Sequence, residues 1–186
     1  MLMHPRPLVQ LKSFDNSWYH PGRPFWVRGL WFLVNVAVLQ CPLNPGSRLR
    51  VWALRLFGAR VGAGVVIKPR VNIKYPWKLQ IGNDCWIGEG VWIDNLGMVV
   101  LEHDVCLSQE CLLLCGNHNY KAPSFDLMVG DILVESGSWI GARSVVCPGV
   151  TVRSHAVLTA GSVATSDMEA WGVYQGHPAR KIRERL

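Results

Sequence analysis

His118 is the side chain with the strongest claim to chemistry in this sequence of 186 residues. It lies between Asn117 and Asn119, where a regular repeat gives way to a segment rich in Gly, Pro and polar residues. Because imidazole titrates near neutral pH, a histidine presented there could accept the proton of an attacking hydroxyl group. The alternative, judged on position alone, is an ordinary histidine in an exposed loop.

Four possible metal ligands, Cys106, Cys111, Cys115 and His118, lie close together in the sequence. Zinc sites usually pair their cysteines with about two to four residues between them. Here the spacing follows the repeat and points Cys111 inward, so we expect no metal site. The sequence also lacks the glycine-rich phosphate loop of nucleotide-binding enzymes and the Gly-x-Ser-x-Gly elbow of hydrolases.

The elements that must position His118 form a repeat in which an aliphatic residue recurs every six positions. Helices repeat at about 3.6 residues and strands at about 2, whereas hexapeptide repeats are the signature of a parallel β-helix. The rival interpretation is chance periodicity in a sandwich of short strands. The phase shifts by two residues at 73–81 and 93–101. The aliphatic positions are Val61, Ile67, Ile73, Ile81, Ile87, Ile93, Leu101, Leu107, Leu113, Val134, Ile140, Val146, Val152, Leu158 and Ala164.

The repeat divides the chain into three parts. We expect an N-terminal arm and helical cap over 1–60, and a hexapeptide-repeat β-helix over 61–170 with an inserted loop at 115–133. Insertions in solenoids project from one corner and often carry the binding face. The tail, 171–186, is expected to hold one strand followed by a short basic helix.

Two helices are expected before the repeat, at 25–39 and 48–57, with Pro42 and Pro45 ending the first. Neither reaches the about 20 apolar residues that span a bilayer. One role is to cover the open end of the β-helix. The other is peripheral contact with an anionic membrane surface, because tryptophans and arginines alternate in this segment.

The composition argues against several classes of protein. Hydrophobic residues make up 49% of the chain, which argues against disorder. Residues 1–70 hold ten Lys or Arg and one acid, so the net charge of +6 is an N-terminal property and does not indicate nucleic-acid binding. Residues 1–10 do not resemble a secretory leader. Six cysteines in a chain of this size do not require disulfides, so we expect a cytoplasmic, reduced protein.

Several stretches outside and inside the repeat carry a recognisable pattern. They include Gly116-Asn-His118, Trp139-Ile-Gly-Ala-Arg143 and Tyr174-Gln-Gly-His-Pro-Ala-Arg180, together with 16–28, 66–77, 86–96 and 158–165. With these stretches nearly the whole chain resembles the hexapeptide-repeat acyltransferases. It is most similar to the WcaF-like colanic acid biosynthesis acetyltransferase group, which is related to the maltose and galactoside O-acetyltransferases.

The resemblance implies a left-handed β-helix, a homotrimer with active sites between neighbouring prisms, acetyl-CoA as donor and a sugar hydroxyl as acceptor in exopolysaccharide or surface glycan biosynthesis. It implies no metal. His118 matches the general base of the family. The positions that match coenzyme contacts are Ala142 and Ala160 along its arm, Thr165 and Ser166 nearer its nucleotide, and Arg180 and Arg183 in the basic tail.

The chain departs from the family at two places. Related sugar acetyltransferases carry an Asn on an early coil as an acceptor or oxyanion contact, and the hexad phase places Gly88 there. Position 166 is often Lys in the family, so Ser166 implies weaker coenzyme binding. The polar residues that remain as substrate-binding candidates are Asp94, Asn95, Ser108 and Asn117.

Two rival functions share the expected fold. One is a β-helix without catalysis that acts as a scaffold subunit. The other is a metalloenzyme similar to γ-carbonic anhydrase, whose chemistry needs several histidine ligands, and the sequence has no His-x4-His pair.

Overall fold

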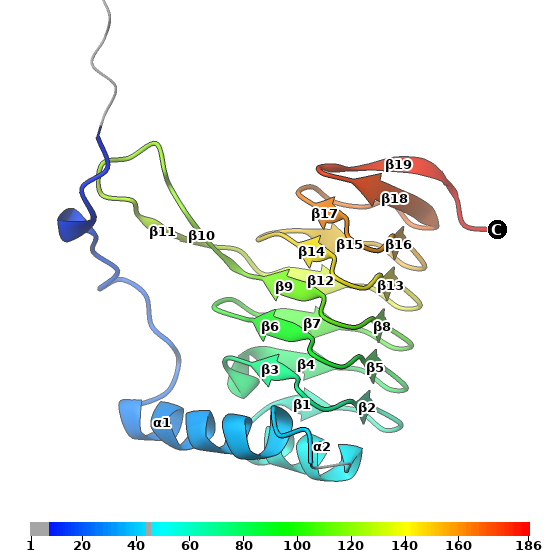
Figure 1. The fold of residues 1–186 in the computed structure, drawn as a ribbon, viewed down its shortest axis with the longest axis horizontal. Coiled ribbons are helices and arrows are strands. Elements are labelled where there is room, and N and C mark those ends of the chain that lie inside the picture. The colour runs from blue at the N-terminus through cyan, green and yellow to red at the C-terminus, as the bar shows by residue number, and fades with distance from the viewer. Residues whose placement is uncertain (1–7, 44–45) are drawn as a thin grey trace, which may run out of the picture.

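The computed structural model describes residues 8–43 and 46–186, and in it the chain winds into a three-sided prism (Figure 1). Each coil contributes one strand to each of three parallel sheets, so sequence neighbours lie on different faces. The first face holds β1 (Arg60–Val61), β4 (Leu79–Ile81), β7 (Val99–Leu101), β12 (Ile132–Val134) and β15 (Thr151–Val152). The second holds β2 (Val66–Ile67), β5 (Trp86–Ile87), β8 (Cys106–Leu107), β13 (Trp139–Ile140) and β16 (Val157–Leu158). The third holds β3 (Asn72–Ile73), β6 (Trp92–Asp94), β9 (Leu112–Leu114), β14 (Val145–Val146) and β17 (Val163–Ala164).

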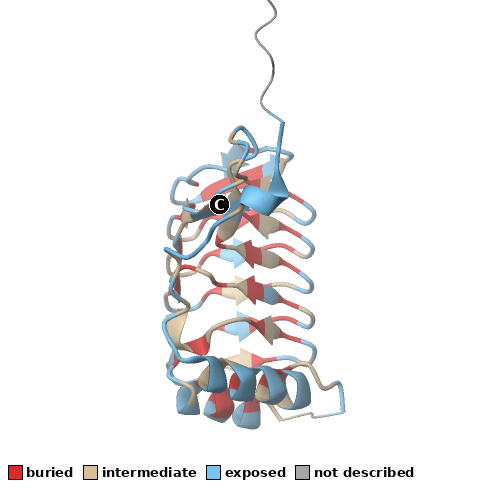
Figure 2. Cartoon of the chain, turned by 90° about the vertical axis from the view of Figure 1, so that its left-hand side faces the viewer, coloured by how far each residue is buried: buried red, intermediate tan, exposed pale blue. Residues whose placement is uncertain are grey.

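The hexad residues stack in columns inside the prism. On the second face, the registers pair Ile67 with Ile87, Ile87 with Leu107 and Leu107 with Ile140. These side chains are 0–1% exposed, and Figure 2 shows the buried segments repeating from coil to coil. Full burial of one such side chain stabilises the fold by about 1.5–3 kcal/mol. The prediction of an all-β solenoid, a left-handed parallel β-helix, is therefore confirmed.

Leu107 lies in the middle of its column, and its replacement tests the stacking account. We expect Leu107→Ala to lower the free energy of unfolding by about 2–5 kcal/mol, because it leaves a cavity between two rigid neighbours. Cys106→Ala, on the same strand but pointing outward, serves as the control. Chemical denaturation of both variants measures the difference, and equal losses would contradict the inward assignment.

The helices at the N-terminal end cap the first coil. They are α1 (Phe25–Val34), which continues as the π-helical turn Asn35–Leu39, and α2 (Ser47–Leu56), close to the predicted helices (Figure 1). The indole of Trp31 donates to the carbonyl of Ile73 at 2.8 Å, and the guanidinium of Arg55 donates to the carbonyl of Val61 at 2.8 Å. These bonds satisfy backbone groups that no further coil pairs. The predicted cap is confirmed.

Residues 1–7 and 44–45 lie outside the described part of the chain. The expectation about a secretory leader falls largely on the first of these stretches, and the expectation that Pro45 helps to end the first helix falls on the second. No helix in residues 8–43 and 46–186 is long and apolar enough to cross a membrane.

The extra residues between β3 and β4 form a short 3₁₀ turn, Pro76–Lys78. Asn95, one coil further on, fastens this turn. Its side chain is 0% exposed, accepts from the amide of Tyr75 at 2.9 Å, and donates to the carbonyls of Tyr75 and Lys78. The prediction that Asn95 binds substrate is therefore wrong, because its carboxamide is buried and fully used by the backbone.

The insertion expected at 115–133 leaves the third coil as an antiparallel hairpin of β10 (Gly116–His118) and β11 (Leu127–Val129) (Figure 1). The N-terminal arm reaches this hairpin. It contains the short turn Leu11–Ser13, and the amide of Gln10 donates to the carbonyl of Pro123 at 2.8 Å. From there the arm runs back along the prism to α1, and encloses a space between itself and the coils.

The C-terminal tail differs from the prediction. It forms β18 (Gly172–Gly176), which pairs with β16, and β19 (Ala179–Glu184), which runs antiparallel to β18. The predicted strand is confirmed and the predicted basic helix is wrong. The last segment has good helix formers, but β18 presents an unpaired strand edge beside it, and tertiary pairing outweighs weak local propensity.

Candidate active site

His118 is the last residue of β10, half-buried and opposite Leu127, where the hairpin strands give way to its loop. Its Nδ1 lies 2.9 Å from the backbone oxygen of Phe125. A carbonyl oxygen can only accept a hydrogen bond, so Nδ1 carries the proton and the neutral imidazole keeps its lone pair on Nε2. The hairpin thus presents a histidine in the tautomer that a general base requires.

Phe125 holds the imidazole in place on a second side. Its ring stacks on His118 with centroids 4.4 Å apart and planes 7° apart, while the ring of Phe14 from the arm lies 5.5 Å away. The backbone of Phe125 has a φ of +53°, a left-handed conformation that costs a residue other than Gly about 1–3 kcal/mol. The same residue supplies both the carbonyl and the stacked ring, so the strained turn orients His118.

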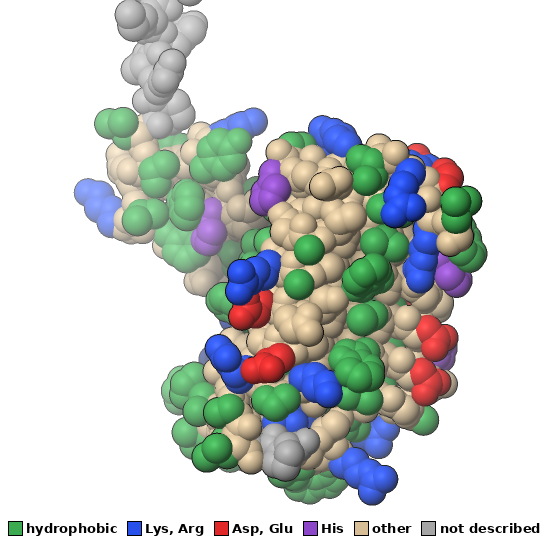
Figure 3. Space-filling model, turned by 45° about the vertical axis from the view of Figure 1, so that its right-hand side comes forward, with side chains coloured by type: hydrophobic (Ala, Val, Ile, Leu, Met, Phe, Trp, Pro, Cys, Tyr) green, Lys and Arg blue, Asp and Glu red, His purple; other side chains and the backbone are tan. Residues whose placement is uncertain are grey.

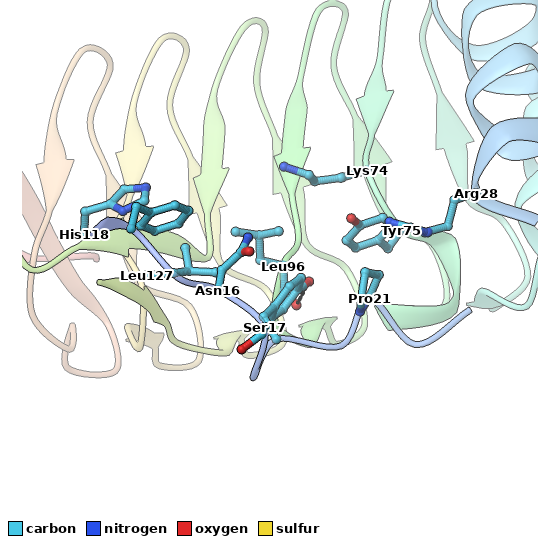
Figure 4. A pocket seen from close by; sticks show the side chains of 11 residues that line it. Asn16, Ser17, Pro21, Arg28, Lys74, Tyr75, Leu96, His118 and Leu127 are labelled. Carbon is cyan, nitrogen blue, oxygen red and sulfur yellow. Dashed lines mark hydrogen bonds between the residues drawn. The ribbon is translucent and has the colours of Figure 1, made fainter. Parts of the chain in front are cut away.

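A cleft of about 600 Å³ lies beside His118, and Figure 4 shows it extending over several coils, with His118 at one end and Arg28 at the other. Five parts of the chain line it: the arm, α1, the corner after β3, the corner after β6, and the hairpin. The lining residues are Phe14, Asn16, Ser17, Tyr19, Pro21, Arg28, Lys74, Tyr75, Leu96, His118 and Leu127.

Half-buried polar groups tie the arm to the wall of this cleft. The hydroxyl of Tyr19 donates to the carbonyl of Leu96 at 2.8 Å, and the ammonium of Lys78 donates to the same carbonyl at 2.6 Å. Burial raises the pKa of Tyr19 and lowers the pKa of Lys78. At neutral pH Tyr19 therefore stays protonated and keeps donating its hydrogen bond.

Among the predicted polar contacts, Asp94 lies near the cleft. Its carboxylate forms an ion pair of 2.8 Å with the ammonium of Lys74, which lines the cleft wall. Asn117 is adjacent to His118 but is exposed, and it lines a separate hollow of about 320 Å³ together with Thr165. Ser108 lies at another corner, after β8, where its hydroxyl accepts from the indole of Trp139 at 2.8 Å.

The predicted coenzyme residues lie on two corners and on the tail. Ala142 and Ala160 follow β13 and β16, on the corner between the second and third faces. Thr165 and Ser166 follow β17, on the corner from which the hairpin leaves, and both are exposed. Exposed Arg180 and Arg183 lie on β19, and Arg183 borders a hollow of about 310 Å³ with Trp139 and Thr159. Within a single chain, Ala142 and Ala160 therefore lie on a different corner of the prism from the hairpin that carries His118.

Packing explains why Gly88 occupies the position at which related sugar acetyltransferases carry an Asn. A Cβ atom added to Gly88 would lie 2.8 Å from the backbone amide of Gln109 and the carbonyl oxygen of Leu107 in the next coil. Such contacts are too short for any side chain, so the close approach of two coils requires glycine there. The polar contact of the relatives cannot be built at Gly88 without moving the backbone.

The cysteines near His118 are dispersed. Cys111 and Cys115 point into the core, and burial raises the pKa of their thiols to about 12 and about 11. Such thiols stay protonated at neutral pH and are poor metal ligands. Cys106 points outward on β8. Within the described residues no group of three His, Cys, Asp or Glu side chains is arranged to hold a metal.

The sequence did not assign Asn16, Ser17, Tyr19, Arg28 or Tyr75 to the active site, although they line the cleft. A signal was present, because they fall in the stretches 16–28 and 66–77, which match the family pattern. The hexad repeat does not require those stretches. This pattern, which the scaffold does not explain, was the available pointer to the residues that line the cleft.

Comparison with known proteins agrees with the fold described above. Residues 132–166 match the family model described as hexapeptide repeat of succinyl-transferase. The chain is 34% identical over 157 residues to the "Putative colanic acid biosynthesis acetyltransferase WcaF" of Escherichia coli (strain K12), which covers 84% of this chain and 86% of that protein. It is 28% identical over 134 residues to the galactoside O-acetyltransferase of the same organism, over 68% of this chain and 64% of the relative.

Solved structures share the fold. A hexapeptide-repeat acetyltransferase from Vibrio cholerae O1 biovar eltor, complexed with acetyl coenzyme A, superposes with a TM-score of 0.80 at 19% identity, over 95% of this chain and 96% of the other. A galactoside acetyltransferase in complex with coenzyme A gives a TM-score of 0.76 at 23% identity, over 87% and 82% of the two chains. From its repeat, its fold and its 34% identity, the chain belongs to the hexapeptide-repeat acetyltransferases, in the WcaF-like colanic acid biosynthesis group.

Proposed function

We propose that the protein is an O-acetyltransferase that moves an acetyl group from acetyl-CoA to a sugar hydroxyl in exopolysaccharide or surface glycan biosynthesis. The observation that carries the proposal is His118, whose Nδ1 is bound to the carbonyl of Phe125 at one end of a cleft of about 600 Å³. The WcaF relative supports the reaction class, and the coenzyme complexes of the structural relatives support the donor.

In the proposed reaction, Nε2 of His118 accepts the proton of the sugar hydroxyl as its oxygen attacks the thioester carbonyl carbon. A tetrahedral oxyanion forms and collapses, and the carbon–sulfur bond breaks. The imidazolium then returns its proton to the departing thiolate, which leaves an acetyl ester on the sugar and free CoA. Proton transfer by a positioned base contributes about 10²–10⁴-fold to such rates.

The coenzyme belongs, in this proposal, between two copies of the chain. The small side chains of Ala142 and Ala160 would leave room for a narrow pantetheine arm along their corner, and Arg180 and Arg183 suit its phosphates. Because these alanines lie on a different corner from His118, a homotrimer would join the corner of one subunit to the hairpin of the next. The outward row of the second face carries two exposed tryptophans, Trp86 and Trp139, which a subunit interface would bury.

A screen of acceptors with acetyl-CoA, following free thiol, tests the proposed function. We expect thiol release that depends on a glycan, whether free, nucleotide-linked or lipid-linked. Coenzyme binding without release for any of these acceptors would instead favour a scaffold subunit without catalysis.

We also propose that the helical end touches a membrane from the cytoplasmic side. Phe25 and Trp26 on α1 are 80% and 70% exposed, and Trp52 on α2 is 59% exposed. Figure 3 shows hydrophobic side chains gathered at this end of the molecule with Lys and Arg among them. Aromatic residues beside arginines suit the interface of an anionic bilayer. All six cysteines are free, as expected in a reducing compartment.

Sedimentation with liposomes checks the membrane contact. We expect binding to vesicles that contain phosphatidylserine, release by high salt, and loss of most binding in the double variant Phe25→Ser, Trp26→Ser. Trp171→Ser, an exposed tryptophan at the opposite end, should bind like the parent protein. Equal sedimentation with neutral vesicles at high salt would contradict an electrostatic contribution, and unchanged binding of the double variant would contradict the assigned face.

A further inference from the structure

A second cavity adjoins the cleft beside His118. This second cavity, of about 520 Å³, lies between α1 with its π-helical extension and the first two coils. Arg28, Lys74 and Tyr75 line both cavities, so the two spaces meet at these residues. Figure 4 shows Lys74, Tyr75 and Arg28 together at the end of the cleft that is remote from His118.

Taken together, the two adjoining cavities are too long for one sugar ring. Lys74 and Tyr75 belong to the corner of the first coil, and His118 leaves the corner of the third. Neighbouring strands lie about 4.8 Å apart, so this part alone extends by roughly 10 Å before the second cavity begins. Each cavity by itself has the size of a small-molecule site, about 300–1,000 Å³.

The second cavity has the lining of a carbohydrate site. Trp92 is 46% exposed and offers an aromatic face. The amide oxygen of Asn72 accepts from the side chains of Asn35 at 2.7 Å and Gln40 at 3.4 Å, so these amides are fixed in place at the cavity wall. Apolar and aromatic surface with a few fixed polar groups is what a polar ring compound needs for binding and orientation. Neither the repeat nor proton transfer at His118 needs this surface.

The junction of the two cavities is positively charged. Lys74 is neutralised by Asp94 at 2.8 Å, but none of the ion pairs within residues 8–43 and 46–186 includes Arg28. Nε of Arg28 is buried and has no hydrogen-bond acceptor among those residues. A guanidinium group with unused hydrogen-bond donors, placed where the two cavities adjoin, can bind a carboxylate or phosphate oxygen of a ligand.

We infer that the acceptor is an acidic oligosaccharide. Its reacting hydroxyl lies at His118, its carboxylate or phosphate group binds Arg28, and a further sugar lies in the second cavity against Trp92. This inference rests on the proposed function and adds the class of acceptor to it.

The test compares three acceptors of equal length: a neutral trisaccharide, a trisaccharide with an internal uronic acid, and a trisaccharide with a phosphate at its reducing end. For the parent protein we expect kcat/KM to be higher for at least one acidic acceptor than for the neutral one. Charged hydrogen bonds contribute about 1.5–3 kcal/mol, so Arg28→Gln should reduce the acidic-to-neutral ratio about tenfold to hundredfold. Arg23→Gln, an exposed arginine nearby that lines neither cavity, should keep the parent ratio.

Equilibrium binding of the same trisaccharides, without acetyl-CoA, gives a second measure that does not depend on turnover, and Trp92→Ala should weaken it. The two acidic arms separate a uronic acid from a phosphate as the group bound by Arg28. Equal kcat/KM for all three acceptors, or an equal loss for all three in Arg28→Gln, would overturn the inference and leave the acetyltransferase intact. Absence of transfer to any glycan would instead contradict the proposed function.

Discussion

His118→Ala is expected to lose acetyl transfer by about 10²–10⁴-fold while the protein keeps its fold and its coenzyme affinity. The loss follows from the geometry, because the carbonyl of Phe125 fixes the proton on Nδ1 and leaves Nε2 as the base. The side chain lies at the surface of a hairpin outside the aliphatic columns, so its removal opens no cavity in the prism. The effect should therefore fall on kcat and leave the melting temperature close to that of the parent.

The matched control is His103→Ala. His103 is exposed at a corner of the prism, where its Nδ1 accepts from the amide of Asn83 at 3.0 Å, away from the cleft. Steady-state kinetics, coenzyme titration by calorimetry and a melting curve on both variants separate the two cases. If His118→Ala acetylates at the parent rate, or if His103→Ala loses as much, the assignment of the base is wrong.

Two inactive variants are expected to restore activity when they share one trimer. Ala160→Trp should block the coenzyme groove, and it should spare the core because the side chain of Ala160 is exposed. His118→Ala removes the base at the other corner. If each site combines the hairpin of one subunit with the alanine corner of its neighbour, every mixed trimer contains one intact site, or about a third of the parent turnover.

Coexpression with two different affinity tags allows the mixed trimers to be isolated, and their kcat can be compared with that of each variant alone. Trimers that carry His118→Ala on all differently tagged copies are the control and should stay inactive. No recovery in the mixed trimers would contradict a site shared between subunits. Assemblies that are not trimeric would contradict the symmetry on which the expected fraction depends.

The β-helix could be predicted from the sequence because the same buried apolar contact repeats in every hexad. Each hexad buries one aliphatic residue against the coils above and below. The six-residue spacing therefore predicts that Ile87, Leu107 and Ile140 point inward and stack on one another. His118 could be predicted because it stands where that period breaks. The cap could be predicted because an open coil end needs a cover, and Trp31 and Arg55 supply the hydrogen bonds.

The remaining features depend on contacts between distant parts of the chain. Nothing local in the last strand shows that it will pair with β18, and the local helix propensity indicated the opposite. The sequence suggested that the side chain of Asn95 is free to bind substrate. In the structure its carboxamide donates to the carbonyls of Tyr75 and Lys78, in the extra residues of the preceding coil. The cleft arises when the arm, at Gln10, contacts the hairpin at Pro123, more than a hundred residues away, and no sequence period encodes that contact.

Transfer of an isotopically labelled acetyl group from acetyl-CoA to a glycan is the most direct test of the central claim. The purified protein is incubated with labelled acetyl-CoA and glycan acceptors, and the products are analysed by mass spectrometry and NMR. The structure predicts a labelled acetyl ester on a sugar hydroxyl, formed in equal amount with free CoA and almost absent with His118→Ala. Release of CoA without label on the glycan, or equal labelling by the parent and His118→Ala, would contradict the claim that this prism is an O-acetyltransferase with His118 as its base.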